Sequence, residues 1–236
     1  MSQPSEKVDS KVDIKDMLEA AVHFGHKTQK WNPKMKKYIY TSKNGIHIFD
    51  LEKTKANLEK ALDFVKKASS NNKTILFVST KPQSAHLVVE AAEACHMPYV
   101  IHKWMGGLLT NFTTIKQRIR YLKSLKDQEK SGEFEKYTKK EASELRKTID
   151  KLESALGGVS SLDALPDAVF VVDTLRDRIA VNEANKMKIP VIGIVDSNSD
   201  PDGVNYTIPG NDDAVKSLTY LIQKVKCGIL EGKGTR

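Results

Sequence analysis

The sequence predicts an α/β fold: a doubly wound parallel sheet into which an antiparallel coiled-coil helical hairpin is inserted. Two observations support this prediction. In both halves of the chain, short uninterrupted apolar runs alternate with segments of helical periodicity, which is typical of strands covered by helices on both faces. Between residues 103 and 167 the alternation stops, and two long apolar stripes with three- and four-residue spacing replace it.

Several elements are expected before the alternation begins. Residues 14–24 have the helical spacing of apolar side chains and end at Gly25. Asn44-Gly45 separates two short β-like runs and predicts a hairpin, because this dipeptide favours the two-residue turn between antiparallel strands. Asp50 is suited to cap a long helix over residues 51–69, whose apolar side chains share one face.

The alternating region predicts four strands of the parallel sheet, at residues 74–79, 99–102, 168–172 and 191–195. A short extended piece is expected at residues 206–208. Helices are expected at residues 83–96, 176–187 and 212–227. Pro82 supports the start of the first of these helices, because proline is tolerated in the first turn, where the backbone N–H has no partner within the helix.

The interruption predicts a projecting arm. Its first apolar stripe runs from Phe112 to Leu125 and its second from Ala142 to Leu156, with a polar turn between them. At a rise of about 1.5 Å per residue, such helices would project roughly 30 Å from the sheet. The predicted organisation is a flexible N-terminal tail (1–12), one discontinuous α/β domain (13–107 and 157–228), the coiled-coil arm (108–156) and a flexible C-terminal tail (229–236).

The acid-free segment Ala20–Phe49 carries the clearest functional signal. It contains six lysines and no aspartate or glutamate, within a chain of formal net charge +8. A field of one sign that nearby carboxylates do not cancel attracts polyanions. Aromatic residues and the Asn32-Pro33 turn are interleaved with the lysines, which favours a nucleic acid as partner over a merely solvated lysine-rich surface.

The sequence contains no recognisable catalytic site. After the first strand of the sheet, where a nucleotide-binding enzyme would carry a glycine-rich loop, the chain reads Ser79-Thr80-Lys81-Pro82. Cys95 and Cys227 have neither metal-ligand spacing nor the pattern of a disulfide framework. We therefore expect a protein that is not an enzyme and has no small-molecule substrate.

No complete set of metal ligands can be identified from the sequence, so neither a metal nor a cofactor is predicted. The weak candidates are two residue pairs. His23 and His26 are three positions apart and could share the end of a helix. Asp196 and Asp200 belong to a run with the alternate spacing of a calcium loop, but the run lacks that loop's glycine and terminal glutamate. Loosely bound magnesium at this run remains the open alternative.

The N-terminus and the length of the apolar runs bear on location. Residues 1–10 are polar and of mixed charge, without the apolar core of a signal peptide. No apolar run approaches the length needed to span a bilayer. We expect a cytoplasmic protein with no membrane partner.

Motifs along almost the whole chain resemble the bacterial family of small-subunit ribosomal protein two, the universal S-two family. The matching motifs, in order, are His23-Phe24-Gly25-His26, Trp31-Asn32-Pro33-Lys34-Met35, Gly45-Ile46-His47-Ile48-Phe49-Asp50-Leu51, Leu109-Thr110-Asn111 and Ile208-Pro209-Gly210-Asn211-Asp212-Asp213-Ala214. The sequence departs from the family pattern at Ser79, Lys103, Met105, Asn205 and Lys216. At position 103 arginine is common, and lysine keeps its charge but lacks its bidentate fork, which weakens the expectation of a specific phosphate clamp.

The resemblance implies a flavodoxin-like sheet and a structural role in the small ribosomal subunit, in support of translation. It places the protein on the solvent side of that subunit, between head and body, bound to small-subunit ribosomal RNA and neighbouring ribosomal proteins. These neighbours include the first ribosomal protein, which the family helps to recruit. Two alternatives stay open from the residues alone: a nucleotide- or sugar-phosphate-binding enzyme of doubly wound fold, and a pure protein-interaction scaffold that uses the arm.

The candidate RNA-binding residues are polar, basic or aromatic side chains in the acid-free segment and near the arm. The lysines would neutralise phosphates without reading sequence. Trp31 and Trp104 would either stack on exposed bases or pack in the core, and Arg118 and Arg120 would add phosphate contacts near the base of the arm. The full set is Lys27, Lys30, Trp31, Asn32, Lys34, Lys36, Lys37, Lys103, Trp104, Arg118 and Arg120.

Overall fold

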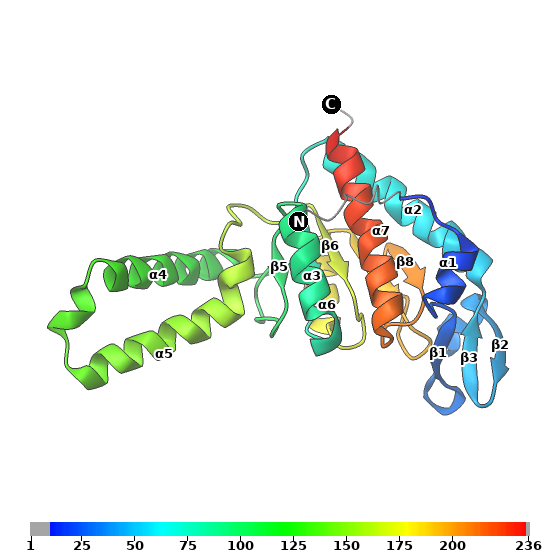
Figure 1. Ribbon diagram of the computed structural model, residues 1–236, viewed down its shortest axis with the longest axis horizontal. Coiled ribbons are helices and arrows are strands. Elements are labelled where there is room, and N and C mark those ends of the chain that lie inside the picture. Colours follow the sequence, from blue (N-terminus) through cyan, green and yellow to red (C-terminus); the bar gives the residue numbers. More distant parts are fainter. Residues whose placement is uncertain (1–9, 235–236) are drawn as a thin grey trace, which may run out of the picture.

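The computed structural model describes residues 10–234, and its centre is a five-stranded parallel sheet (Figure 1). The strands are β4 (Ile75–Val78), β5 (Tyr99–Val100), β6 (Ala168–Val171), β7 (Val191–Val195) and β8 (Tyr206–Pro209). Their spatial order is β5-β4-β6-β7-β8. The first strand along the chain therefore lies inside the sheet, and the chain winds outward from it in both directions, as in flavodoxin-like folds. The predicted doubly wound parallel sheet is confirmed.

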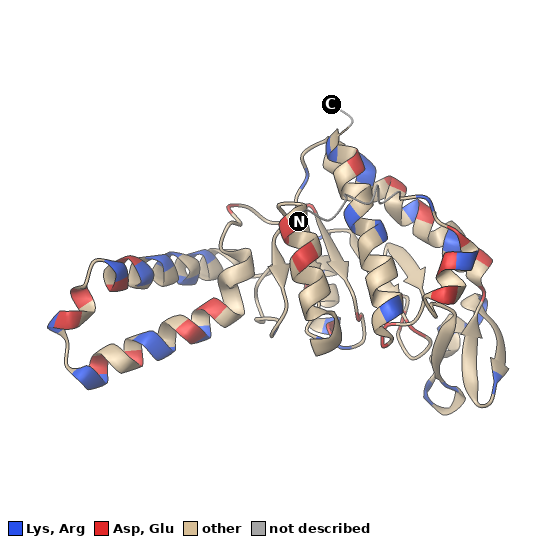
Figure 2. Cartoon of the chain, in the orientation of Figure 1, with Lys and Arg blue, Asp and Glu red and all other residues tan. Residues whose placement is uncertain are grey.

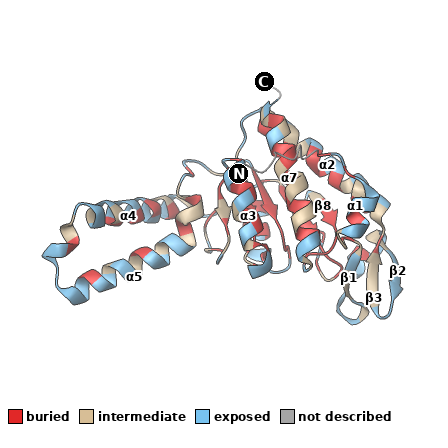
Figure 3. Ribbon diagram, in the orientation of Figure 1, coloured by how far each residue is buried: buried red, intermediate tan, exposed pale blue. Residues whose placement is uncertain are grey.

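Helices cover both faces of this sheet, and its strands are buried between them (Figure 3). On one face lie α2 (Leu51–Ser70), α3 (Pro82–Ala94) and α7 (Val215–Gly234); on the other lies α6 (Arg178–Lys186) with the start of the arm. Within β4, Ile75 and Phe77 pack into the first apolar cluster, and Leu76 and Val78 into the second. Because successive side chains of a strand point to opposite faces, all of them must be apolar here, which explains the uninterrupted runs.

The arm consists of two helices that extend away from the sheet side by side (Figure 1). They are α4 (Phe112–Lys130) and α5 (Lys139–Leu156), joined through Gly132, whose φ is +76°, and a short 3-10 turn, η3 (Glu133–Lys136). An apolar cluster separate from the main core packs between them: Leu122, Leu125, Phe134, Ala142 and Ile149. The helices stand where the stripes predict them, whereas coiled-coil packing between them stays a prediction.

A second, three-stranded antiparallel sheet, called here the small sheet, forms from residues 24–49. Its strands are β1 (Phe24–Lys27), β2 (Ile39–Lys43) and β3 (Ile46–Phe49), in the order β1-β3-β2. The predicted hairpin joins β2 to β3, and both turn residues have positive φ, +53° at Asn44 and +75° at Gly45. Asp50 then caps α2 by accepting the backbone N–H of Glu52 at 3.1 Å, as predicted.

The helix predicted over residues 14–24 is wrong in its second half. Helix α1 (Ile14–Glu19) ends because Ala21 adopts a left-handed conformation with φ of +59°, and the N–H of Val22 bonds back to the carbonyl of Met17 at 3.0 Å. The chain then enters β1. An alanine gives no sequence signal for such a turn, because left-handed backbone is ordinarily a glycine or asparagine feature.

Both predicted tails are wrong for the residues that the structure describes. Helix α7 does not end near Cys227 but runs to Gly234, with Ile229 fully buried. The backbone N–H and hydroxyl of Ser10 donate to Glu231 at 2.9 and 2.7 Å, and Val12 belongs to the core. Residues 10–12 and 229–234 are therefore packed structure, whereas residues 1–9, 235 and 236 lie outside the described residues. None of the described helices is both long and apolar enough to cross a membrane.

Candidate nucleic-acid interface

The acid-free segment forms a basic surface on the small sheet and the turns beside it. Lys27 ends β1, and two 3-10 turns follow, η1 (Thr28–Lys30) and η2 (Pro33–Tyr38). All six lysines are exposed: Lys27, Lys30, Lys34, Lys36, Lys37 and Lys43. Figure 2 shows basic but no acidic residues on this sheet. The structure thus gathers the predicted lysines of the acid-free segment at one end of the molecule.

The segment is held in place by contacts with residues far along the chain. The side chain of Asn32 caps η2 by accepting the N–H of Lys34 at 3.0 Å, and its own N–H donates to the carbonyl of Ser197 at 2.7 Å. Met35 is fully buried in a cluster with Phe49 and Val195. The lysines therefore project from an ordered surface, which lowers the entropy lost when that surface binds a partner.

Lys34 differs from the other lysines of the segment. Its ammonium lies 2.8 Å from a carboxylate oxygen of Asp200 and 2.5 Å from one of Asp202. The hydrogen bond to Asp200, and then that to Asp202, raises the pKa of Lys34. Two carboxylates already face its charge, so Lys34 is less free to neutralise a phosphate than its neighbours. Asp200 faces Lys34 and is not among the side chains that the structure brings together as possible metal ligands.

The two tryptophans have different environments. Trp31 is 36% exposed, and its ring centroid lies 5.1 Å from that of His47, so it remains available for stacking. Trp104 is only 6% exposed, and its indole N–H donates to Glu183 at 3.1 Å. Of the two roles expected for Trp104, the structure favours the core role over base stacking, because the ring packs in the core on the α6 side of the parallel sheet. Its neighbour Lys103 is exposed.

Glu183 of α6 fixes the loop that leads into the arm, a role that sequence reasoning missed. Its carboxylate also accepts the N–H groups of Gly107 at 2.7 Å and Leu109 at 3.0 Å, and both the N–H and the hydroxyl of Thr110 at 3.2 and 3.1 Å. Burial alone would raise the pKa of Glu183, but these hydrogen bonds and that of Trp104 lower it. Only its position on the inward face of α6 could have drawn attention to it.

The predicted arginines lie at the other end of the molecule. Arg118 and Arg120 are exposed in the first half of α4, and neither forms an ion pair with a described residue. The small sheet and the arm extend from opposite ends of the parallel sheet (Figure 1). The candidate RNA-binding residues therefore form two separated surfaces and not one continuous patch.

An acidic cluster, buried except for Asp213, lies where the parallel strands end, at what we call the carboxyl edge of the sheet. Its four carboxylates follow three neighbouring strands: Asp173, Asp196, Asp212 and Asp213. Lys81, which follows β4, points its ammonium at three of them, at 3.2 Å from Asp173, 2.9 Å from Asp212 and 2.7 Å from Asp213. Burial would lower the pKa of Lys81, but the carboxylates raise it. Burial, and then the nearby Asp196 and Asp173, raises the pKa of Asp212 to about 7.

This cluster makes the carboxyl edge unsuitable for a nucleotide, although nucleotides bind at that edge in many doubly wound proteins. The ammonium of Lys81 is already surrounded by carboxylates, and the N–H of Thr80 donates to Asp177 at 3.0 Å. Carboxylates repel phosphate, and Pro82 has no N–H to offer. The geometry gives no support to the nucleotide-binding enzyme.

The same edge contains a group of side chains that could hold a metal ion. The Nδ1 atom of His26 lies 3.1 Å from Asp196 and its Nε2 atom 3.3 Å from Asp213. His26, Asp196 and Asp212 each offer a ligand atom, and these atoms lie within 4.8 Å of one another. Hydrogen bonding to Asp196 raises the pKa of His26. Of the predicted candidates, the structure therefore brings together His26 and Asp196.

The other predicted metal candidates do not join this group. His23 packs against the ring of Phe24 at 4.0 Å, and its Nδ1 atom is buried without a hydrogen-bond partner among the described residues. Asp212 was missed, although its position three residues after the end of β8, the last strand of the sheet, is the signal that could have identified it. His23 and His26 do not share a helix end, because α1 stops at Glu19.

Comparison with known proteins agrees with this arrangement and with the motifs. The chain matches the family model described as Ribosomal protein S2 over residues 17–232. The small ribosomal subunit protein uS2 of Hahella chejuensis is 49% identical over 223 residues, which cover 94% of this chain and 88% of that protein. The match spans the small sheet, the parallel sheet and the arm, and the family is one of structural, non-enzymatic proteins. The chain belongs to the ribosomal protein S2 family.

Proposed function

We propose that this protein is a structural constituent of the small ribosomal subunit, where it supports translation by binding small-subunit ribosomal RNA and neighbouring ribosomal proteins. Its place of action is then the cytoplasm, within that subunit. The observation that carries the RNA contact is the exposed, acid-free lysine surface on the ordered small sheet. Family membership supports the ribosomal setting.

The small sheet would bind RNA through its phosphates. Five exposed lysines have no carboxylate partner among the described residues: Lys27, Lys30, Lys36, Lys37 and Lys43. Such contacts release counterions from the RNA and position the protein without reading sequence. Trp31 could add a stacking contact with an unpaired base.

The arm would supply a second attachment at a distance from the first. Its apolar stripes favour coiled-coil packing of α4 on α5, which would make the arm rigid. Arg118 and Arg120 add positive charge near the base of the arm. Two attachments on one rigid body raise the effective concentration of each once the other has formed. Ribosomal RNA and neighbouring ribosomal proteins, including the first ribosomal protein, are the partners that family membership suggests.

Sedimentation of tagged protein with ribosomal particles tests the lysine surface, in lysates with and without ribonuclease. We expect Lys36→Glu with Lys37→Glu to abolish most of the association at moderate salt. Lys186→Glu with Lys147→Glu is the matched control, because these exposed lysines lie on α6 and α5, away from the small sheet (Figure 1). Association that survives the first pair unchanged would favour the pure protein-interaction scaffold.

Salt dependence provides a second measurement of the same surface. If five lysines engage phosphates, log affinity for a ribosomal RNA fragment should fall against log salt with a slope of roughly −4 to −5. The Lys36→Glu and Lys37→Glu double variant should reduce that slope by about 2. A slope near zero in the unaltered protein would contradict the electrostatic account.

We also propose a structural cation, without a catalytic role, at His26, Asp196 and Asp212. A histidine nitrogen beside carboxylate oxygens favours zinc over the loosely bound magnesium expected from the sequence, because magnesium prefers oxygen ligands. His26 belongs to the small sheet, and the two aspartates follow strands of the parallel sheet. A bound cation would therefore fasten the RNA-binding surface to the main domain.

A further inference from the structure

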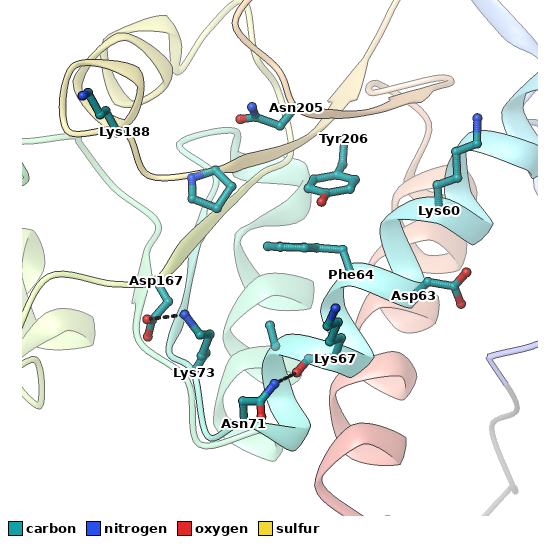
Figure 4. A pocket seen from close by; sticks show the side chains of 12 residues that line it. Lys60, Asp63, Phe64, Lys67, Asn71, Lys73, Asp167, Lys188, Asn205 and Tyr206 are labelled. Atoms are coloured by element: carbon teal, nitrogen blue, oxygen red, sulfur yellow. Dashed lines mark hydrogen bonds and ion pairs between the residues drawn. The ribbon is translucent and has the colours of Figure 1, made fainter.

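A cavity of about 920 Å³ opens at the amino edge of the parallel sheet, the edge opposite Lys81 and the acidic cluster. The second half of α2 forms one wall, and the segments that lead into β4, β6, β7 and β8 form the remainder (Figure 4). The volume lies within the range of sites that bind small ligands. Nothing in the proposed contacts of the small sheet or the arm uses this cavity.

The charge around the cavity is positive. Four lysines line it, Lys60, Lys67, Lys73 and Lys188, against two carboxylates, Asp63 and Asp167. Only Lys73 is paired, with Asp167 at 3.3 Å (Figure 4). The other three lysines form no ion pair with any residue between 10 and 234. Since two positive charges remain uncompensated, the cavity is suited to an anion.

The cavity also presents aromatic rings. Phe64 of α2 and Tyr206 of β8 stack with ring centroids 4.3 Å apart and an interplanar angle of 22° (Figure 4). Both side chains are half-buried and line the cavity, so the pair offers π surface to a ligand. Flat rings surrounded by lysines are the combination with which proteins hold single-stranded nucleic acid, stacking the bases and neutralising the backbone.

Two amide side chains add hydrogen-bonding capacity. Asn71 donates its amide N–H to the carbonyl of Lys67 at 2.8 Å, which leaves its Oδ1 as an acceptor. Asn205 accepts the N–H of Val191 on its Oδ1 at 2.8 Å, which leaves its NH₂ group as a donor. Both residues line the cavity and are exposed, so one acceptor and one donor can meet the edge of a base.

A nucleotide within an RNA chain suits the cavity better than a free nucleotide. The wall formed by α2 is the carboxyl half of that helix, and its last turn carries partial negative charge. The residues that line the cavity include no glycine-rich loop and no helix N-terminus, the features that hold a concentrated phosphate charge. Dispersed lysines instead match a backbone with one charge per nucleotide.

We infer that this cavity binds an unpaired nucleotide of single-stranded RNA, with the base against the Phe64–Tyr206 pair and the backbone among Lys60, Lys67 and Lys188. This site would be a further RNA contact beyond those of the proposed function. It lies at the opposite edge of the parallel sheet from the small sheet.

Fluorescence anisotropy with a labelled five-nucleotide RNA tests the inference. The background variant replaces all five lysines of the small-sheet contact with alanine, at positions 27, 30, 36, 37 and 43, so that the outcome does not depend on the proposed function. In that background we expect Phe64→Leu to weaken binding about fivefold or more, because stacking is lost while most of the apolar volume is kept. Equal affinity of the Phe64→Leu protein would overturn the stacking role.

Surface variants keep the test independent of folding. Lys67→Ala with Lys188→Asn removes two charges, and asparagine tolerates the positive φ of +59° at position 188. We expect this pair to weaken binding about tenfold or more and to reduce the salt slope by 1 to 2. The matched control is Lys123→Ala with Lys130→Ala, two exposed lysines of α4. An equal loss of RNA affinity in the two double variants would show that the lysines act only through non-specific charge and would overturn the inferred site.

Competition identifies the source of the ligand. Unlabelled single-stranded RNA should displace the probe, whereas a duplex of the same sequence should not, because its bases are not available for stacking. Uridine monophosphate should compete only weakly. Competition by the mononucleotide at the same concentration as the oligonucleotide would overturn the assignment to RNA in favour of a free nucleotide, and competition by the duplex would overturn the requirement for an unpaired base.

Discussion

At the scale of single residues, two side chains decide which surfaces the protein presents. Glu183 accepts hydrogen bonds from several groups of the loop before α4 and so fixes the position from which the arm begins. Lys34 shows the opposite effect, because its pairing with Asp200 and Asp202 withdraws one positive charge from the basic surface. In both cases the partner lies far away in sequence, and charge alone does not reveal the role.

Replacing Glu183 with glutamine should destabilise the protein. The amide NH₂ group cannot accept hydrogen bonds, so some of the N–H groups of residues 107–110 lose their partner, and each unsatisfied buried donor costs about 1–3 kcal/mol. We expect Glu183→Gln to lower the free energy of unfolding by about 2–4 kcal/mol, measured by urea denaturation. The exposed Glu144→Gln on α5 serves as control and should change it by less than about 0.5 kcal/mol. An equally small change in the unfolding free energy of Glu183→Gln would contradict the role of this carboxylate as hydrogen-bond acceptor for the loop.

The same residue predicts a pH dependence. Hydrogen bonds outweigh burial and lower the pKa of Glu183 below its ordinary value of 4.5. A lowered carboxyl pKa stabilises the folded state above the unfolded pKa, and that contribution is lost as pH falls through the folded pKa. The difference in unfolding free energy between the unaltered protein and Glu183→Gln should therefore be constant from about pH 7 to about pH 5.5 and shrink below about pH 4.5. A difference that grows on acidification would refute the assignment.

At the scale of elements, the close packing of α7 on α2 holds the C-terminal residues 229–234 against the rest of the protein. A Cβ atom at Gly232 would lie 2.5 Å from the carbonyl oxygen of Lys66 and 2.9 Å from the Cβ of Ser69. The two helices can therefore approach closely only because position 232 has no side chain. This contact explains why residues 229–234 are helical where the sequence suggested a tail: a polar, glycine-containing end is read as flexible unless its partner is known.

A pair of glycine substitutions tests this packing. Gly232→Ala should push α7 away from α2 and lower the free energy of unfolding by about 1–3 kcal/mol, because the clash involves backbone that cannot move aside. Gly234→Ala is the control, since a Cβ there meets nothing within 4 Å and alanine favours the helix. Denaturant titration of both variants provides the measurement. Two variants of equal stability would show that the helices do not pack this closely.

At the scale of the whole molecule, the parallel sheet separates two attachment surfaces. The small sheet with its lysines lies at one end, and the arm extends from the other (Figure 1). The acidic cluster at the carboxyl edge lies between the small sheet and the parallel sheet, and His26 of β1 contacts two of its carboxylates. The stability of that junction therefore controls how the two surfaces are oriented relative to each other.

Addition of zinc should strengthen the junction. A ligand at about 100 times its Kd adds roughly 2.7 kcal/mol to the stability of the folded state, which raises the Tm of a domain of this size by about 5–10 °C. We expect this rise in thermal denaturation of the unaltered protein and its reversal by a chelator. His26→Ala should abolish the rise, whereas His86→Ala, which changes an exposed histidine of α3, should retain it. A rise of equal size in both variants would place the zinc elsewhere.

The sequence alone predicted the elements that are determined by residues close together in the chain. The strands of the parallel sheet, the Asn44-Gly45 hairpin and the cap at Asp50 follow from apolar patterning and turn chemistry. The candidate sites depend on contacts between distant residues, and these were only partly predictable. Lys34 and Asp200 are 166 positions apart, and no local pattern indicates that they pair. Trp104 could be assigned to RNA or to the core only once its surroundings were known.

The contacts that hold the small sheet in place also set the order in which the chain can acquire its shape during synthesis. The N–H groups of His26 and Asn32 bond to Ser197, and the carbonyl of Val22 accepts the N–H of Asn211. Since a chain emerges from its N-terminus, the lysines leave the ribosome early, but the residues that fix them emerge late. A chain arrested before residue 196 should therefore be cleaved by trypsin at these lysines more readily than the full chain. The protein would then present its complete RNA-binding surface only when its own translation is nearly finished.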